Sequence, residues 1–207
     1  MAFEPKFMKE SPSQTAGPYV HIGLTPNLQD ITGVYKTDPG AQMLTPGTKG
    51  ERIAITGRVL DGSGMAVADA VLEIWQADAD GSYGGAHGPS SNTTPAFTGW
   101  GRKATDSEGR YRFETIKPGR VPGPDGKPMA PHVTLWIVAR GINTGLHTRI
   151  YFDDEAGANA ADPVLTRIMD TRRRPTLVAK RSVEDGKGIY THDIRLQGED
   201  ETVFFDI

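Results

Sequence analysis

The chain of 207 residues contains no cysteine, so disulfide bridges and thiolate metal sites are excluded. It also lacks an apolar run long enough to span a membrane and a signal-type N-terminal segment. We therefore expect a cytoplasmic protein with no membrane partner. Basic clusters are scarce as well, because the net charge is −3 and 172–174 is the only run of three basic residues. A nucleic-acid partner is not expected, since phosphate binding usually needs a basic patch.

Amphipathic helical patterns are nearly absent too. Only 162–169 combines an N-cap aspartate, a proline at the first helical position and apolar residues at helical spacing. Elsewhere 25 glycines and 15 prolines divide the chain into short segments of alternating polarity, which is typical of strands. Strands are expected at 53–56, 70–77, 110–115, 132–140, 148–153, 176–183, 188–196 and 201–206. The sequence thus predicts an all-β fold, an antiparallel β-sandwich with long loops and little helix.

The first 50 residues differ from the rest in composition. They are rich in Pro, Gly, Thr and Gln and have few alternating apolar residues, so they cannot form a core of their own. A chain of 207 residues is otherwise of a length that suits one domain. We expect residues 1–50 to form an extended N-terminal arm that packs on a partner subunit, and residues 51–207 to form a single β-sandwich domain.

The expected strand at 132–140 has two different faces. One face is apolar and belongs in the core, and it consists of Val133, Leu135, Ile137 and Ala139. The other carries His132, Thr134 and Arg140, which are costly to bury without partners. A His-x-His pair in a strand offers two imidazoles to one metal. Here the second position is Thr134, whose hydroxyl is a poor ligand for Fe(III).

Four segments, taken in order, resemble intradiol ring-cleaving dioxygenases. They are Ser-Gln-Thr-Ala-Gly-Pro-Tyr at 13–19, Leu-Glu-Ile-Trp-Gln-Ala-Asp at 72–78, Thr-Ile-Lys-Pro-Gly at 115–119 and Ala-Pro-His-Val-Thr at 130–134. In the iron-bearing members the resemblance implies two tyrosine and two histidine ligands. Tyr83 and His132 match one of each, whereas the other two positions fall at about Val121 and Thr134. The resemblance therefore implies no metal site in this chain, with Tyr83 and His132 as vestigial positions.

Family members of this kind pair an iron-free α subunit with a β subunit that binds Fe(III), and this chain resembles the α type. The resemblance implies a multi-copy αβ assembly that cleaves the ring of protocatechuate with O2. The product is 3-carboxy-cis,cis-muconate, an intermediate of aromatic catabolism by the β-ketoadipate route. The resemblance implies no catalytic residue in this chain, which instead completes the active-site pocket of its partner.

The resemblance places five residues of this chain at the substrate. Arg140 has a guanidinium that can pair bidentately with the substrate carboxylate, and a structural salt bridge is its alternative role. Tyr19 offers an aromatic face with a polar tip, and Gly17 permits close approach of the backbone. Thr15 and Pro18 belong to the same N-terminal loop, for which a turn followed by a surface aromatic is the plainer interpretation.

Two other functions stay open at this point. One is a self-sufficient intradiol dioxygenase with unusual ligands, which would carry iron when purified alone. The other is a non-catalytic β-sandwich module that binds a small molecule, because fold does not imply function.

Overall fold

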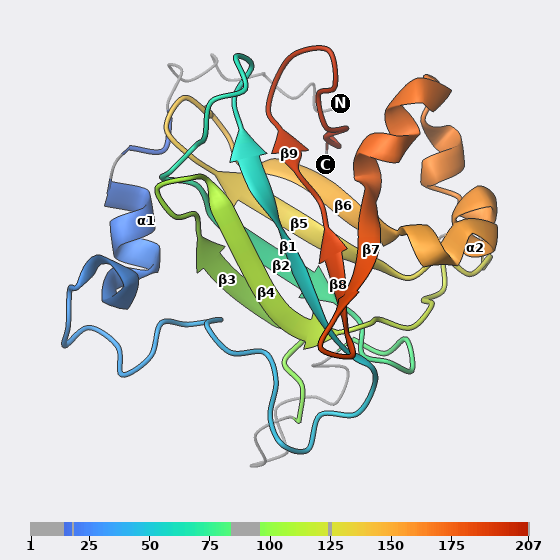
Figure 1. Cartoon of the computed structure of the whole chain (residues 1–207), viewed down its shortest axis with the longest axis horizontal. Helices are drawn as coiled ribbons and strands as arrows, with labels where there is room; N and C mark the ends of the chain where they lie inside the picture. Colours follow the sequence, from blue (N-terminus) through green and yellow to red (C-terminus); the bar gives the residue numbers. More distant parts are fainter. Residues whose placement is uncertain (1–14, 18, 84–95, 124–125, 207) are drawn as a thin grey trace, which may run out of the picture.

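The computed structural model describes residues 15–17, 19–83, 96–123 and 126–206. Within these residues the chain is mostly β-structure with short helical turns (Figure 1). The strands are β1 (Arg52–Leu60), β2 (Val71–Gln76), β3 (Trp100–Ala104), β4 (Arg110–Ile116), β5 (His132–Val138), β6 (Leu146–Phe152), β7 (Val178–Glu184), β8 (Lys187–Thr191) and β9 (Ile194–Arg195). The α-helices are α1 (Tyr19–Leu24) and α2 (Ala156–Ala161), and the 3-10 helices are η1 (Pro26–Gln29), η2 (Asp153–Glu155), η3 (Leu165–Arg167) and η4 (Thr171–Leu177). The all-β class with little helix is confirmed.

Each predicted strand except the last is found. Residues 201–206 do not form a strand, and only Phe205 pairs with His147 in an isolated bridge. The predicted start at 176 is also wrong, because η4 extends to Leu177 before β7 begins. Strand β3 was not predicted, since its sequence Trp-Gly-Arg-Lys-Ala has little alternation of apolar and polar residues.

The strands form one mixed sheet in the order β3-β2-β5-β6-β7-β8-β1-β4, with β9 paired to β1. The purely antiparallel arrangement expected from the sequence is wrong for three pairs, because β1–β8, β1–β9 and β6–β7 are parallel. Between β6 and β7 the chain passes through the helical segment 153–177, and such a crossover is what a parallel connection requires.

The main hydrophobic core draws buried side chains from strands throughout this order. The two end strands, β3 and β4, also contact each other, so the sheet curls around the core. The predicted inner face of β5 is confirmed, because Val133, Leu135 and Ile137 are fully buried in this core and Ala139 follows them. Other buried members of the core are Ile53, Ile55, Leu72, Ile74, Phe113 and Ile150.

The helix predicted at 162–169 is wrong. Its residues form the single 3-10 turn η3, and the α-helix α2 ends at Ala161. Asp162 is the C-cap of α2 and not the N-cap of η3, which is Val164. Its Oδ1 nevertheless accepts hydrogen bonds from the backbone N–H of Val164 at 2.8 Å and of Leu165 at 3.0 Å. Its other oxygen accepts from the N–H of Ala130 at 2.8 Å. The fully buried carboxylate therefore fixes the approach to β5 rather than the start of a long helix.

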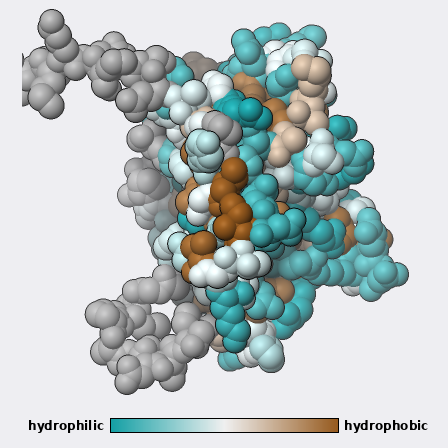
Figure 2. All heavy atoms as spheres, turned by 90° about the vertical axis from the view of Figure 1, so that its left-hand side faces the viewer, coloured by the Kyte–Doolittle hydropathy of each residue, from teal (hydrophilic) through white to brown (hydrophobic). Residues whose placement is uncertain are grey.

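The described part of the predicted arm is anchored at its C-terminal end. The N–H of Arg102 in β3 donates to the carbonyl of Gly40 at 2.9 Å, and Met43 is buried in the main core. Nearer the N-terminus, large apolar side chains are exposed, and these are Tyr19, Leu28, Ile31, Val34 and Tyr35. Figure 2 views this side of the molecule and shows hydrophobic residues among hydrophilic ones. Packing of the arm on a partner subunit stays a prediction.

No helix in the described part of the chain is both long and apolar enough to cross a membrane.

Candidate functional site

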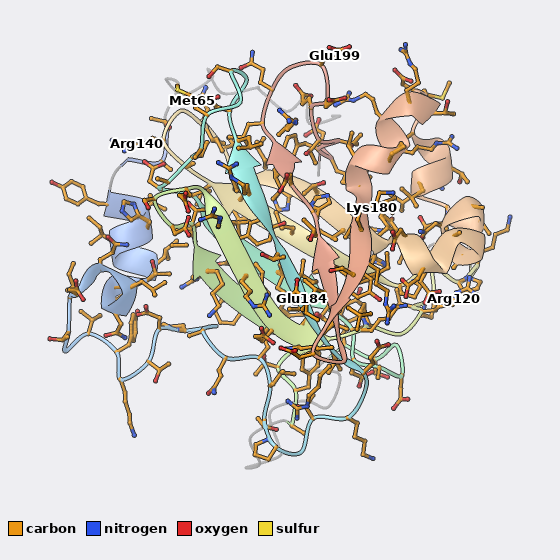
Figure 3. All side chains as sticks on the ribbon, in the orientation of Figure 1. Met65, Arg120, Arg140, Lys180, Glu184 and Glu199 are labelled. Atoms are coloured by element: carbon orange, nitrogen blue, oxygen red, sulfur yellow. The ribbon has the colours of Figure 1, made fainter. Side chains whose placement is uncertain are left out.

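The residues predicted from the sequence lie at the two ends of β5. His132 begins the strand, and Arg140 lies in the turn that follows its last residue, Val138. The backbone from His132 to Val138 covers roughly 20 Å at about 3.3 Å per residue. In Figure 3, Arg140 lies next to α1, whereas Arg120, which precedes Val121, lies on the far side of the molecule. The predicted substrate residues and the vestigial metal positions are therefore two separate groups.

Arg140 is paired with Asp69, which precedes β2. Its Nε donates to the Asp69 Oδ2, and the arginine side chain is 63% exposed while the aspartate side chain is only 14% exposed. Within the described part of the chain, the terminal nitrogens Nη1 and Nη2 have no hydrogen-bond acceptor. Asp69 thus holds the guanidinium by one edge, and no other described residue pairs with the opposite edge, which suits a second carboxylate.

The N-terminal segment lies against the same turn. The hydroxyl of Thr15 accepts from the N–H of Gly141 at 2.8 Å and donates to the carbonyl of Ile142 at 3.0 Å. The N–H of Ala16 also donates to Ile142, at 3.3 Å. The structure thus places Thr15 beside the turn that contains Arg140. These bonds hold the N-terminal segment against the turn and leave one lone pair of the Thr15 hydroxyl as a further acceptor.

The other residues of this segment have few contacts. Tyr19 begins α1 and is 78% exposed, so its ring is free to meet a partner or ligand. A Cβ added to Gly17 would have no atom within 4 Å among the described residues. The open space at Gly17 is compatible with close approach of a ligand or partner, and its substrate role stays a prediction. Pro18 lies outside the described residues.

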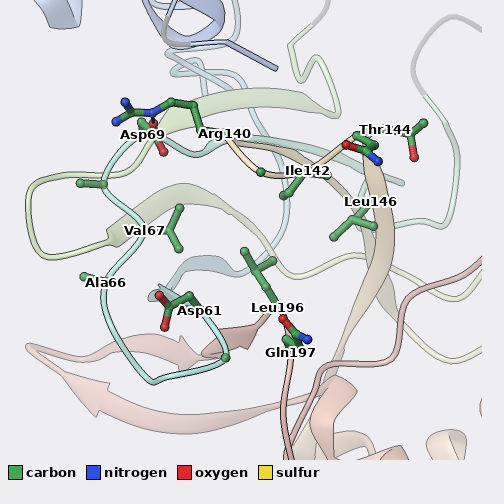
Figure 4. Close-up of a pocket in the computed structure, with 14 residues that line it drawn as sticks. Asp61, Ala66, Val67, Asp69, Arg140, Ile142, Thr144, Leu146, Leu196 and Gln197 are labelled. Carbon is green, nitrogen blue, oxygen red and sulfur yellow. Dashed lines mark hydrogen bonds and ion pairs between the residues drawn. The ribbon is translucent and has the colours of Figure 1, made fainter. Parts of the chain in front are cut away.

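An open groove of about 720 Å³ borders Arg140 (Figure 4). Its apolar wall includes Ile142, Leu146 and Leu196, and its polar wall includes Asp61 and Asp69. The volume is in the range of small-molecule sites. Two carboxylates in the wall disfavour an anion inside the groove, so an anionic group would approach the free edge of Arg140 at its rim.

At the other end of β5, two turns bring Tyr83 and Val121 together. The first turn contains Gly81, where a Cβ would lie 2.1 Å from the carbonyl oxygen of Arg120. A Cβ on Gly119 in the second turn would lie 2.5 Å from the backbone of the first. Only glycine allows the two turns to approach so closely. As a result Tyr83 packs in one apolar cluster with the buried Val121.

His132 lies near this cluster and is 4% exposed. Its Nδ1 is 2.8 Å from the carbonyl oxygen of Ala130, an acceptor, so Nδ1 carries the proton. The ring centroids of His132 and Tyr151 are 5.7 Å apart. Burial lowers the pKa of His132, and the positive charge of Arg149 lowers it further. The imidazole is therefore neutral at pH 7.

Arg149 also lies at the His132 end of β5, and the sequence alone did not identify it. It stands directly opposite Thr134 in the β5–β6 register, and its Nη1 donates to the hydroxyl of Tyr151 at 3.4 Å and to the sulfur of Met129 at 3.5 Å. Alternation in the predicted strand 148–153 places Arg149 and Tyr151 on one face, which was the available signal. The register that aligns Arg149 with Thr134 cannot be read from the sequence.

These residues do not fit Fe(III). The two missing ligand positions are filled by Val121 and Thr134, and apolar and hydroxyl side chains do not replace phenolate and imidazole. Among the described residues no three histidine, aspartate or glutamate side chains gather as a metal site.

Comparison with known proteins agrees with this geometry. The family model described as Dioxygenase matches residues 26–198. The chain belongs to the intradiol dioxygenase family. It is 50% identical over 204 residues to the protocatechuate 3,4-dioxygenase alpha chain of Pseudomonas putida, covering 97% of this chain and 98% of that relative. The protocatechuate 3,4-dioxygenase beta chain of Burkholderia cepacia is 38% identical over 162 residues, covering 74% of this chain and 67% of the beta chain.

The solved structures show the same fold. The 3-chlorocatechol 1,2-dioxygenase of Rhodococcus opacus 1CP matches with a TM-score of 0.60 at 20% identity, over 92% of this chain and 69% of that one. The similarity to an alpha chain over nearly the whole length is thus closer than the similarity to the beta chain.

Proposed function

We propose that this chain is the alpha chain of a protocatechuate 3,4-dioxygenase and completes the active site of a beta chain that holds Fe(III). The enzyme cleaves the ring of protocatechuate between its two hydroxylated carbons with O2 and yields 3-carboxy-cis,cis-muconate. The observation that carries the proposal is identity of 50% to an alpha chain over 97% of this chain, together with Val121 and Thr134 at two ligand positions.

The separation along β5 supports a shared site. Strand β5, from His132 to Val138, is roughly 20 Å long and separates Arg140 from the vestigial positions. This length is beyond the reach of any side chain. A carboxylate held by Arg140 therefore could not place its ring at a metal next to His132. This separation supports a metal supplied by another chain, and we assign that role to the beta chain.

Within such a site the chain binds and orients the substrate. Arg140 presents the free edge of its guanidinium to the substrate carboxylate, and Asp69 holds the opposite edge. Thr15 secures the N-terminal segment to the same turn, and in this proposal Gly17 and Tyr19 of that segment border the substrate. Tyr19 supplies an aromatic surface that excludes water. The Fe(III) of the beta chain supplies the redox chemistry when bound.

The N-terminal arm contributes to assembly. Its exposed apolar side chains, Tyr19 to Tyr35, would lose contact with water on packing against the beta chain. A complete enzyme then contains several copies of the alpha-beta pair.

Co-expression with a beta chain tests this function. We expect the two chains to purify together, iron to remain with the beta chain after separation, and protocatechuate turnover to require both. A self-sufficient dioxygenase would instead carry one iron per alpha chain and turn over alone. A binding module would bind protocatechuate in equilibrium dialysis without a beta chain and leave turnover by the beta chain unchanged.

A further inference from the structure

The vestigial metal end of β5 contains a positive charge that belongs to the chain itself. The register places Trp75, Thr134 and Arg149 in one row across β2, β5 and β6. Side chains directly opposite each other in a sheet have Cβ atoms about 5 Å apart. Thr134 is a small side chain, and the long side chain of Arg149 is its direct neighbour across the β5–β6 pair.

The contacts of Arg149 direct its charge toward the surviving ligand positions. Its Nη1 lies 3.4 Å from the hydroxyl of Tyr151, whose ring neighbours that of His132. Burial raises the pKa of Tyr83, and the Arg149 charge opposes that rise. Burial and the Arg149 charge both lower the pKa of His132. In distance terms, the guanidinium is separated from the His132 ring by the Tyr151 ring alone.

A buried carboxylate fixes this arrangement. Tyr151 accepts from Arg149 and donates to Asp162 Oδ1 at 3.1 Å, so one hydroxyl links the cation to the anion. Asp162 is fully buried and is held by backbone N–H groups, which leaves it no freedom to move away. Arg149, Tyr151 and Asp162 are thus joined in one hydrogen-bonded network.

We propose that Arg149 takes the electrostatic place of the metal, so that this end of the chain excludes iron by charge repulsion as well as by its missing ligands. A guanidinium stays protonated at any ordinary pH. A second cation placed among Tyr83, His132 and position 134 would meet a like charge with little water between them. Restoring the two lost ligands would then not be enough to restore metal binding.

The test restores the ligands with and without the arginine. The variants are Val121→Tyr/Thr134→His, the same pair with Arg149→Met, and the same pair with Arg149→Lys, each co-expressed with a beta chain. Iron per alpha-beta pair is measured by elemental analysis, and the visible absorption of tyrosinate bound to Fe(III) is recorded. We expect the Arg149→Met variant alone to gain close to one further iron per pair and added colour. The Arg149→Lys variant keeps the charge. Its iron content and colour should therefore match those of Val121→Tyr/Thr134→His with Arg149 unchanged.

Two results overturn the proposal. Equal iron uptake with and without the charge at position 149 shows that missing ligands alone exclude the metal. No uptake in any well-assembled variant shows that something other than Arg149 blocks the site.

A smaller change covers the case in which these variants do not assemble. Thr134→His/Arg149→Met leaves Val121 in place and provides three ligands, and it is compared with Thr134→His using cobalt(II) as the probe. At least tenfold tighter cobalt binding is expected without the arginine, and equal binding contradicts the proposal.

The proposal rests on the alpha-chain assignment only for the use of a beta partner. If no beta chain co-purifies, the assignment fails, and the same variants are assayed for iron as purified single chains.

Discussion

Replacing Arg140 by alanine should weaken the use of protocatechuate while leaving assembly and iron content intact. In the ion pair with Asp69 the arginine side chain is 63% exposed and the aspartate side chain 14% exposed, so the pair should contribute toward the upper end of the about 0.2 to 1 kcal/mol that exposed pairs add to stability. In a protein of this size such a loss lowers the melting temperature by no more than about 4 °C. The fold should therefore tolerate the substitution.

The effect on catalysis should be larger than the effect on stability. A charge-assisted hydrogen bond contributes about 1.5 to 3 kcal/mol, and about 1.4 kcal/mol corresponds to a factor of ten. If the free edge of Arg140 binds the substrate carboxylate, kcat/KM for protocatechuate should fall roughly ten- to one-hundredfold. Catechol lacks the carboxylate and should lose much less.

The assay is steady-state O2 consumption by the co-expressed enzyme with each substrate. Arg172→Ala is a matched control, since Arg172 is also an exposed arginine paired with an aspartate, Asp170. It should change neither substrate's kinetics. An equal loss for protocatechuate and catechol in Arg140→Ala, or no loss for either, would show that Arg140 is structural and refute the reasoning.

Four further outcomes are expected. The alpha chain separated from its partner should contain no stoichiometric iron by elemental analysis, and one iron per chain would contradict the ligand assignment. Within the predicted arm 1–50, the residues before the anchored segment at 40–44 should exchange amide hydrogens more slowly only when the beta chain is present, and equal protection in both states would show that the arm is not ordered by the partner. Asp69→Asn keeps an acceptor for Arg140 but loses the charge, so KM for protocatechuate should rise by less than in Arg140→Ala, and a larger rise would contradict a positioning role. Burial lowers the pKa of both His132 and His192, so the unfolded chain binds more protons below its histidine pKa of about 6.5 and stability should fall as pH drops from about 7 to 5. Urea unfolding at the two pH values checks this, and His192→Gln should show a weaker pH dependence.

The β-class and the two faces of β5 could be predicted because they depend on local alternation. Burial of Val133, Leu135 and Ile137 on one face follows directly from their spacing. The pairing of β1 with β8 and of β6 with β7 could not be predicted, since parallel contacts join segments far apart in the chain. The same limit explains the error at 201–206, where an alternating segment found no strand to pair with along its length.

The candidate site was only partly accessible to sequence reasoning. The resemblance placed Thr15 and Arg140 in one site. In the structure the Thr15 hydroxyl is hydrogen-bonded to Gly141 and Ile142, which follow Arg140 in its turn. Asp69 and Arg149 were missed because each matters through a contact across the fold. Arg149 becomes informative only when the register sets it opposite Thr134.

That this chain completes the active site of a partner is tested most directly by titrating an iron-loaded beta chain with it and recording protocatechuate turnover. We expect turnover to rise from a low value and to saturate at an equimolar ratio, with Arg140→Ala reaching a plateau about ten- to one-hundredfold lower at limiting substrate. A beta chain that is fully active alone and unchanged by added alpha chain would contradict this account.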